Sequence, residues 1–496
     1  MKHSGYNSQA ARRLDGGEFL FDWEQDSLTA RAGHHPVSPE SLILSGFNRR
    51  GLSATYTWPG SGSSITGFAM RGNQVSGFEE GLGLGDSDNR IHGAVASVRP
   101  LPGGSEALEL SAAYLSGEAP ELGAGVAGDD VSTGGDAWSV SADGLLLDNR
   151  LRLRGEYARS AYDFDGAGGE GAERDHGYSL LASYRPWLDK QIDGSYIDWN
   201  LGAEYKRLGT FFRSPANPGA VADRQVERLF SDLVWGEWGL QAALAQERDN
   251  VEGIAALPRI RTRHGGFNLN YTPAPAYDAQ GVPETGWLGQ PSYSLTANLQ
   301  TQRTDAVADP DPGDWLDTET RVLGFNANFS YSDWSWGIDH TWSRIHDDSL
   351  ASGVPTSNET RSVSTGLNAS FTLLQDYTVS PRIAWDETRY YDLGYTDKGL
   401  LWGLGVDAAF IPGELSGRFN YDESRARLSD GSSDNKSRHL GLSLSWVALP
   451  ERQSRPGVTW VLSGDYNDYT DDLSSANDTD SYQLFLKLLI GWSASY

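Results

Sequence analysis

Cysteine is absent from the 496-residue chain, and methionine occurs only twice. The absence of cysteine excludes a disulfide scaffold and a structural zinc site with cysteine ligands. Long apolar runs are also missing. Since no stretch approaches the roughly 18 to 20 apolar residues of a membrane-spanning helix, a bundle of such helices is excluded. Positive charge is scarce, because 40 Lys and Arg oppose 67 Asp and Glu and give a formal net charge of −27. This balance argues against nucleic acid as a partner, since phosphate binding needs a basic surface.

Glycine and aromatic residues are abundant, with 58 Gly, 17 Trp and 22 Tyr. This composition suits strands and turns better than helices. Many segments alternate apolar and polar residues with a period of two, as a strand with two different faces does. In residues 293–299 the apolar set is Tyr293, Leu295, Ala297 and Leu299. We count about 23 such segments, most of about 8 to 12 residues, the length that a tilted strand needs to cross a bilayer.

The links between these segments alternate between short and long. Residues 59–61 and 236–237 are short links, whereas 304–318 and 429–437 are long and rich in Gly, Asp, Ser and Asn. Up-and-down outer-membrane barrels have tight periplasmic turns and long extracellular loops. A soluble sandwich or propeller has no reason to alternate loop lengths so regularly. Two of the expected turns, at 271–291 and 448–457, are longer than this rhythm predicts.

Tryptophan residues fall mostly near the ends of the expected strands, for example Trp58, Trp235, Trp238, Trp334 and Trp446. Amphipathic rings gather at membrane interfaces, where one edge is wet and the other apolar. Ordinary core aromatics of soluble β domains are the alternative explanation, but they do not account for the alternating links. A closed barrel would also remove the unpaired edges of so large a sheet.

Together these patterns resemble the Gram-negative outer-membrane β-barrel class, with its porin-like and translocator-like members, over roughly residues 17–496. The resemblance implies an all-β fold, a large antiparallel up-and-down transmembrane β-barrel of about 22 to 24 strands, located in the bacterial outer membrane. In that class the final strand ends in an aromatic residue that the barrel assembly machinery reads. Gly491 and Tyr496 fit this signal, whereas Leu489 departs from it because a polar residue is usual at its position.

The domain organisation that we expect is an N-terminal segment, 1–16, which links to an upstream region, followed by one barrel over 17–496. The first residues lack the apolar core of a signal peptide, so either a signal has been removed or the sequence begins partway through a longer protein. If tight turns are periplasmic, the first strand descends from outside and the strand number is odd. A lost upstream strand, a first pair outside the wall, or a connection to a surface or secreted segment would each explain this.

The polar face of the strands predicts the lining of the barrel, since in membrane barrels the apolar face meets lipid. In the last strand, Leu484 and Leu486 belong to the lipid face, and the parity of Lys487 points it into the lumen. Both signs of charge occur on the polar face, as expected for a hydrated lumen in which charges pair across strands. The candidate lumen-lining residues are Arg152, Arg154, Glu156, Asp198, Glu204, Lys206, Arg382, Asp386, Arg418, Asp422 and Lys487.

Signals for an enzyme are thin, and we expect no catalytic residues. The chain has no G-x-S-x-G elbow and no phosphate-binding P-loop. His340 and His346 lie near Asp residues, but such neighbours arise by chance in so acidic a chain. His34 and His35 lie in an expected polar loop without the spacing of a ligand pair on one element. We expect no cofactor.

Acidic loops are the clearest chemical feature. Closely spaced carboxylates suit Ca²⁺, so extracellular loops could bind this ion or bridge through it to lipopolysaccharide. None matches the full calcium-loop pattern, and Asp and Gly in solvated turns explain the composition equally well. We therefore assign no metal site; the Ca²⁺ candidates that the acidic loops offer are Asp163, Asp165, Asp309, Asp311 and Asp314.

One long link, residues 208–219, is apolar and proline-rich, with Phe211, Phe212 and Arg213 side by side. Such a loop gains from burial, either inside the lumen as a constriction or against a partner. A cluster with neighbouring loops is the alternative.

For function we expect a translocation pore or surface anchor for a polypeptide or other large polymer, with secretion or cell-surface display as its context. A passive diffusion porin for small solutes, with cation preference, is the alternative. A soluble β-rich adhesin or an enzyme is a third hypothesis. Expected partners are outer-membrane lipid and lipopolysaccharide, the barrel assembly machinery and an exported or anchored polypeptide.

Overall fold

The computed structural model describes residues 18–75, 81–101, 106–120, 132–166, 171–277, 283–284, 289–305, 314–356, 358–374, 376–451 and 455–491. The N-terminal segment 1–16, the terminal Tyr496 and the Ca²⁺ candidates Asp309 and Asp311 lie outside these residues. In the described ranges, no helix is long and apolar enough to cross a membrane.

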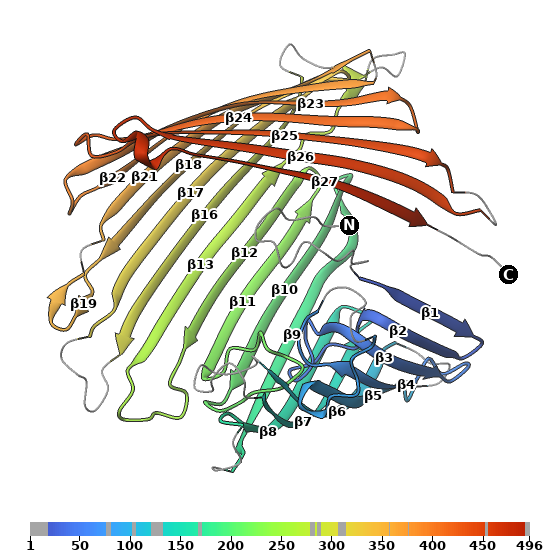
Figure 1. Cartoon of the computed structure of the whole chain (residues 1–496). Helices are drawn as coiled ribbons and strands as arrows, with labels where there is room; N and C mark the ends of the chain where they lie inside the picture. Colours follow the sequence, from blue (N-terminus) through green and yellow to red (C-terminus); the bar gives the residue numbers. More distant parts are fainter. Residues whose placement is uncertain are drawn as a thin grey trace.

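A single sheet of 23 strands contains nearly all of the regular structure (Figure 1). Its first strands are β1 (Leu20–Gln25), β2 (Leu28–Pro36), β3 (Asn48–Thr57), β4 (Ser64–Arg71), β5 (Arg90–Val98), β6 (Leu108–Pro120), β7 (Ser132–Leu146), β8 (Leu151–Asp163) and β9 (Glu173–Ile192). The middle strands are β10 (Ser195–Leu208), β11 (Arg224–Trp235), β12 (Trp238–Arg248), β13 (Arg259–Tyr271), β16 (Gln290–Asp305), β17 (Asp317–Ser330) and β18 (Trp334–Asp347). The last strands are β21 (Thr360–Leu373), β22 (Tyr377–Tyr390), β23 (Tyr395–Ile411), β24 (Leu415–Leu428), β25 (Asp434–Leu449), β26 (Gly457–Asp471) and β27 (Thr479–Gly491).

Small elements lie in the links between these strands. Two short hairpins pair β14 (Ala276–Tyr277) with β15 (Pro283–Glu284) and β19 (Leu350–Ala351) with β20 (Val354–Pro355). The short 3-10 helices are η2 (Ser87–Asn89) and η4 (Ser475–Asn477).

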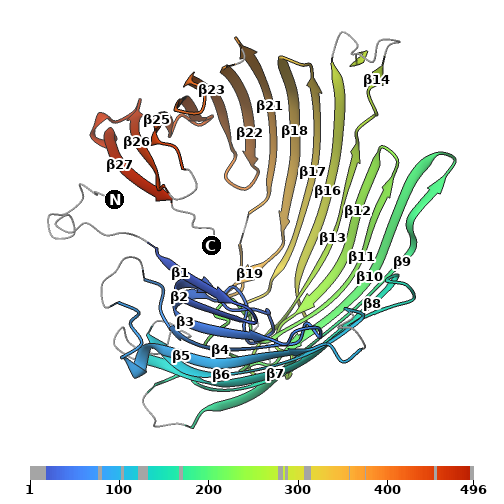
Figure 2. The ribbon, with the colours of Figure 1, turned by 90° about the vertical axis from the view of Figure 1, so that its right-hand side faces the viewer.

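Each strand of the large sheet pairs antiparallel with its neighbours along the chain, and the sheet curls around a central space (Figure 2). This up-and-down connection of 23 strands forms the wall of a large antiparallel β-barrel, which confirms the predicted fold class and strand number. In the described residues β1 pairs with β2 and β27 pairs with β26, and no pairing joins β1 to β27. Because the strand number is odd, these two edge strands run in the same direction.

The alternation of short and long links is confirmed over most of the sheet, with exceptions at both ends. At the end with the short turns, the links of residues 99–107, 272–289 and 450–456 are long. At the end with the long loops, the links of residues 391–394 and 429–433 are short. Several strands exceed the predicted length, and β9 reaches 20 residues. The pairing ladders of the hairpins therefore continue past the apolar band, where water as well as protein can satisfy the backbone.

One sequence expectation about local structure is wrong. His34 and His35 lie in β2 and not in a loop. The His35 ring is buried, and its Nε2 lies 2.8 Å from Ser53 Oγ on the next strand. The pairing of β2 with β3 and the burial of His35 therefore determine the local structure, although the sequence around these histidines is typical of a turn.

Cross-linking tests the register of the sheet, and the absence of cysteine makes the result unambiguous. Ser343 in β18 lies directly opposite Ser362 in β21. We expect Ser343→Cys with Ser362→Cys to oxidise to a disulfide, because directly opposed strand residues fall within disulfide reach. Mobility on gels and the mass of the linked peptides measure this.

The matched control pairs Ser343→Cys with Ser370→Cys, which lies on the same strand and face but about 26 Å further along it. Equal cross-linking of both pairs, or mobility that heating does not change, would contradict the register and the barrel fold.

Candidate functional site: the barrel wall and its lumen

The two faces of the wall differ in chemistry because successive residues of a strand point to opposite sides. Opposed residues in neighbouring strands share a face. The pairing registers therefore show which residues of every strand from β1 to β27 lie on the same face. We call the face with Leu244, Leu299, Leu323 and Leu484 the outer face; all four side chains are exposed. The opposite side is the lumen face. Exposed leucines that no protein covers belong in lipid and not in water.

A girdle of aromatic rings crosses the outer face at the end of the sheet with the short turns. Trp238 stacks on Tyr271 with ring centroids 4.2 Å apart, and Phe329 stacks on Trp336 at 4.5 Å. Tyr293 bridges these pairs, 6.3 Å from Tyr271 and 6.0 Å from Phe329. Such a girdle marks the boundary between hydrocarbon and water.

Taken with the strand number and the apolar band, the girdle decides the class of protein. The chain is an outer-membrane β-barrel. The prediction that tryptophan residues lie near strand ends is confirmed for Trp235, Trp238, Trp334 and Trp446.

The pairing registers place all of the candidate lumen-lining residues on the lumen face. Several form ion pairs across strands there. Arg152 lies 2.6 Å from Asp143, Arg418 lies 2.6 Å from Asp407, and Arg382 donates from Nε to Asp422 at 2.9 Å. These pairs are half-exposed, so each contributes at most about 1 kcal/mol.

The remaining candidates lie in varied surroundings on the same face. Glu204 lies 3.7 Å from Arg228, and Asp198 has a buried carboxylate oxygen without a hydrogen-bond partner in the described part of the chain. Lys206 and Asp386 follow the same strand parity. Lys487, in β27, lies opposite Val461.

Polar side chains of the lumen face lie over glycines of the neighbouring strand, an arrangement that sequence reasoning missed. Asp339 is directly opposite Gly366, and a Cβ atom at this glycine would lie 2.4 Å from the Asp339 carboxylate. The same arrangement pairs Asn298 with Gly266, Thr296 with Gly324, Asn328 with Gly337, Asp386 with Gly399 and Asp422 with Gly403. Each glycine leaves room for the polar side chain to lie flat on the wall. The signal in the sequence was glycine at polar-face positions.

The lumen face of β4 to β8 is instead apolar at the end of the sheet that carries the long loops. Phe68, Met70, Ile91 and Leu115 are buried there. They are covered by two links, residues 37–47 between β2 and β3 and residues 209–223 between β10 and β11, which we call the inner loop cluster. Strands that are apolar on both faces at this end were the signal that could have predicted it.

Hydrogen bonds fasten the two links of the inner loop cluster to each other. Ser214 Oγ donates to the Ile43 carbonyl at 2.6 Å, and Asn217 donates to the Leu42 carbonyl at 2.8 Å. The Leu42 N–H in turn donates to Glu156 on the wall at 2.6 Å. Glu156, a predicted lumen residue, thereby positions a loop and is itself buried. Arg154 reaches the Glu40 carbonyl of the same link at 3.5 Å.

The three residues predicted as a constriction or partner loop separate in the structure. Phe212 is fully buried. Its Cε2 lies next to Gly177 of β9, where a Cβ atom would touch it at 3.4 Å and would clash with Leu208 Cδ2 at 2.6 Å. Phe211 stays 43 % exposed, with its N–H donating to Asp175 at 2.7 Å. The Arg213 N–H donates to Ser160 Oγ at 3.3 Å. Phe212 thus packs against the neighbouring link on the lumen face. A role of this loop as a constriction or as a partner contact stays a prediction.

The extracellular loops use their carboxylates to cap turns. Asp163 accepts from the N–H groups of Asp165 and Gly166 at 3.1 and 2.9 Å, and Asp314 accepts from Ser352 at 2.8 Å. In the loop after β12, burial raises the pKa of Asp249, while the N–H of Ile260 opposes this shift. Within the described ranges, no three His, Cys, Asp or Glu side chains gather as metal ligands would. Calcium binding by these loops stays a prediction.

The histidines weighed as catalytic lie outside the lumen. His340 lies on the outer face, with Nδ1 2.9 Å from Thr365 Oγ1, and His346 contacts Asp348 and Glu359 at 3.2 and 3.8 Å. Gly491, part of the predicted assembly signal, ends β27 opposite Gly457.

Comparisons with known proteins add little. No family model and no curated protein sequence matches the chain. The copper transporter OprC is similar to it with a TM-score of 0.40 and 10 % identity, over 92 % of this chain and 75 % of that one. OccK3 (OpdO) of Pseudomonas aeruginosa has a TM-score of 0.28 and 13 % identity, over 78 % of this chain and 95 % of that one. OmpT of Vibrio cholerae has a TM-score of 0.24 and 10 % identity, over 65 % and 88 %. Likeness this low carries no argument about what the barrel does.

The inner loop cluster predicts different effects of its two phenylalanines. Phe212→Ala should cost about 3 to 5 kcal/mol of local stability, because it empties a fully buried site. We expect faster proteolytic cleavage within residues 209–223 and within 37–47, measured by limited proteolysis of the purified barrel.

The matched control is Phe211→Ala, which removes the same ring from an exposed position. If both variants resist proteolysis like the unaltered protein, Phe212 does not anchor the two links. Unchanged heat-modifiable mobility in both variants shows that the barrel itself has folded.

Proposed function

We propose that the chain forms a wide outer-membrane pore in which a polypeptide or another large polar polymer passes or is held. The breadth of a wall of 23 strands supports this proposal, since the diameter of a barrel grows with strand number. The observation that carries it is the lumen face of β13 to β21, where most residues are Ser, Thr, Asn, Gln or Gly.

Hydroxyl and amide groups hydrogen-bond to the backbone or hydroxyls of a polymer without regard to its charge. The glycine positions hold several of these groups flat, so the wall leaves room for a broad occupant. Away from this sector, ion pairs such as Arg418–Asp407 neutralise much of the lumen charge. A wall of this kind favours weak, repeated contacts over one selective binding point.

The entry of the chain into the wall also fits secretion or surface anchoring. β1 begins at the end of the sheet with the long loops and reaches β2 through a tight turn at Asp26, where φ is 50°. The chain immediately before β1 therefore lies at the extracellular end if the short turns are periplasmic. A segment carried on that side would be displayed at the cell surface.

A passive diffusion channel with cation preference is the second candidate. It is favoured by the formal charge of −27 and by lumen-face carboxylates such as Asp339 and Asp386. Such carboxylates would attract cations into the lumen and repel anions.

Reconstitution in planar bilayers separates the two candidates. We expect added unfolded, uncharged polypeptide to block the current reversibly, with blocks that lengthen as the chain lengthens, because a polymer occupies the lumen. Steady ohmic current with cation preference in a KCl gradient, and no block by any polymer too large to diffuse through, would favour the diffusion channel.

A lumen variant sharpens this test. Gly366→Leu should shorten or abolish the polymer blocks, because the new side chain and the displaced Asp339 carboxylate both enter the lumen. Gly464→Leu, at a glycine on the outer face opposite Leu484, is the control and should leave the blocks unchanged. If polymer blocks the current equally in the two variants, the polymer does not pass along the lumen face of β13 to β21.

A further inference from the structure

We propose that the outer face of β10 to β22 binds a phosphate-bearing lipid of the outer leaflet. Its acyl chains would lie in an apolar groove, and its phosphate groups would lie on a row of arginines. This site is on the lipid side of the wall, so it does not depend on what passes through the lumen.

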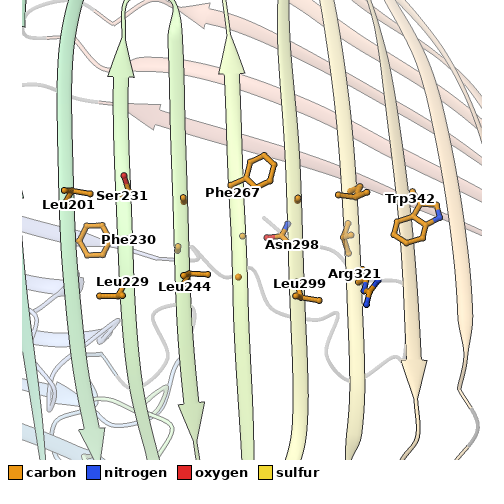
Figure 3. Close-up of a pocket in the computed structure, with 17 residues that line it drawn as sticks. Leu201, Leu229, Phe230, Ser231, Leu244, Phe267, Asn298, Leu299, Arg321 and Trp342 are labelled. Atoms are coloured by element: carbon orange, nitrogen blue, oxygen red, sulfur yellow. The ribbon is translucent and has the colours of Figure 1, made fainter.

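The groove is a hollow of about 910 Å³ that runs across neighbouring strands from β10 to β18 (Figure 3). Gly265 and Ala297 form its floor, because their neighbours project further from the wall. Leu244, Leu299 and Leu323 form its sides and are 65 %, 46 % and 50 % exposed. Side chains this exposed are left for contact with hydrocarbon.

Four arginines form the row: Arg321, Arg344, Arg361 and Arg389. They lie directly opposite one another in the consecutive strands β17, β18, β21 and β22 and share the outer face. Like charges directly opposite across strands repel. Anions beside such a row would remove this repulsion. Arg321 lines the groove itself, so the two features are continuous.

The protein supplies too few anions for the row. Arg321 pairs with Glu319, and Arg344 lies 2.5 Å from Glu359. Arg389 stacks on the ring of Tyr391 at 5.0 Å. Arg361 makes no hydrogen bond or ion pair with any residue in the described ranges and is exposed. The carboxylate of Glu387, on the same face of β22, lies 3.7 Å from Lys398. Arg361 and Arg389 thus have no carboxylate partner in the described ranges and are open to an external anion.

The height of the row on the wall identifies the kind of anion. Along the outer face of β18, the aromatic residues Trp334 and Trp336 come first, then Ile338, His340 and Trp342, and after them Arg344. The arginines thus follow the apolar band at its extracellular end, at the level of lipid headgroups. Guanidinium groups bind phosphate with two parallel hydrogen bonds, which favours phosphate over other headgroup chemistry. A ligand that fills the groove and neutralises the row has both acyl chains and phosphate.

Native mass spectrometry of the full chain in mild detergent tests this inference, with diphosphorylated lipid A as the probe. We expect the unaltered barrel to bind this lipid at least tenfold more tightly than its phosphate-free form. Replacing Arg344→Gln, Arg361→Gln and Arg389→Gln together should weaken binding about a hundredfold, since each cation near an anionic lipid contributes about a factor of five. Ala297→Phe, which fills the floor of the groove, should weaken lipid A binding but leave that of inorganic phosphate unchanged.

The control removes three arginines from the lumen face, by Arg152→Gln, Arg382→Gln and Arg418→Gln, and should retain lipid binding. Heat-modifiable mobility shows that each variant has folded. Equal lipid binding by the two triple variants would overturn the proposal, and so would equal affinity for lipid A and its phosphate-free form. If inorganic phosphate displaces lipid A fully at equal concentration, the row is a free-anion site and the proposed lipid site is wrong.

Discussion

In a bilayer, only neighbouring strands can satisfy the N–H and C=O groups of an extended chain, and the rest of this structure depends on that constraint. It forces each strand of the wall into a continuous antiparallel ladder, and the ladder fixes which residues are opposite one another. Because opposed residues share a face, one register carries a leucine band, an aromatic girdle and an arginine row around the outside. The same register assembles a polar wall on the inside.

The interior has two chemically distinct sectors. From β4 to β8 the lumen face is apolar at one end and lies under the inner loop cluster, where Phe212 and Ile43 are buried. From β13 to β21 it is polar, and glycines hold the polar groups flat against the wall. Two links cover the first sector, whereas the second is a surface of hydrogen-bonding groups. The lumen is therefore lined asymmetrically.

The edges of the sheet follow from the same constraint. With 23 strands, a direct pair of β1 with β27 would be parallel, whereas every pair in the wall is antiparallel. Both edge strands expose large apolar side chains, including Phe21 at 65 % and Tyr482 at 81 %. The described residues therefore form an odd number of strands, as the link lengths predicted. The odd number also sets the end at which the chain enters β1.

The sequence by itself determined the strand class, the approximate strand number, the two faces and the aromatic boundary, because these depend on a period of two and on which residues lipid accepts. It also placed the charged lumen candidates, such as Arg382 and Asp422, on one face. Only the tertiary structure decided which residues are opposite one another. The glycine pairs, the burial of Phe212 beside Gly177 and the alignment of Arg344 with Arg361 all depend on the register between different strands. The alternation within each strand does not contain this register. Alternation specifies a face, whereas register is set by the summed pairing of whole strands, and no single segment carries that information.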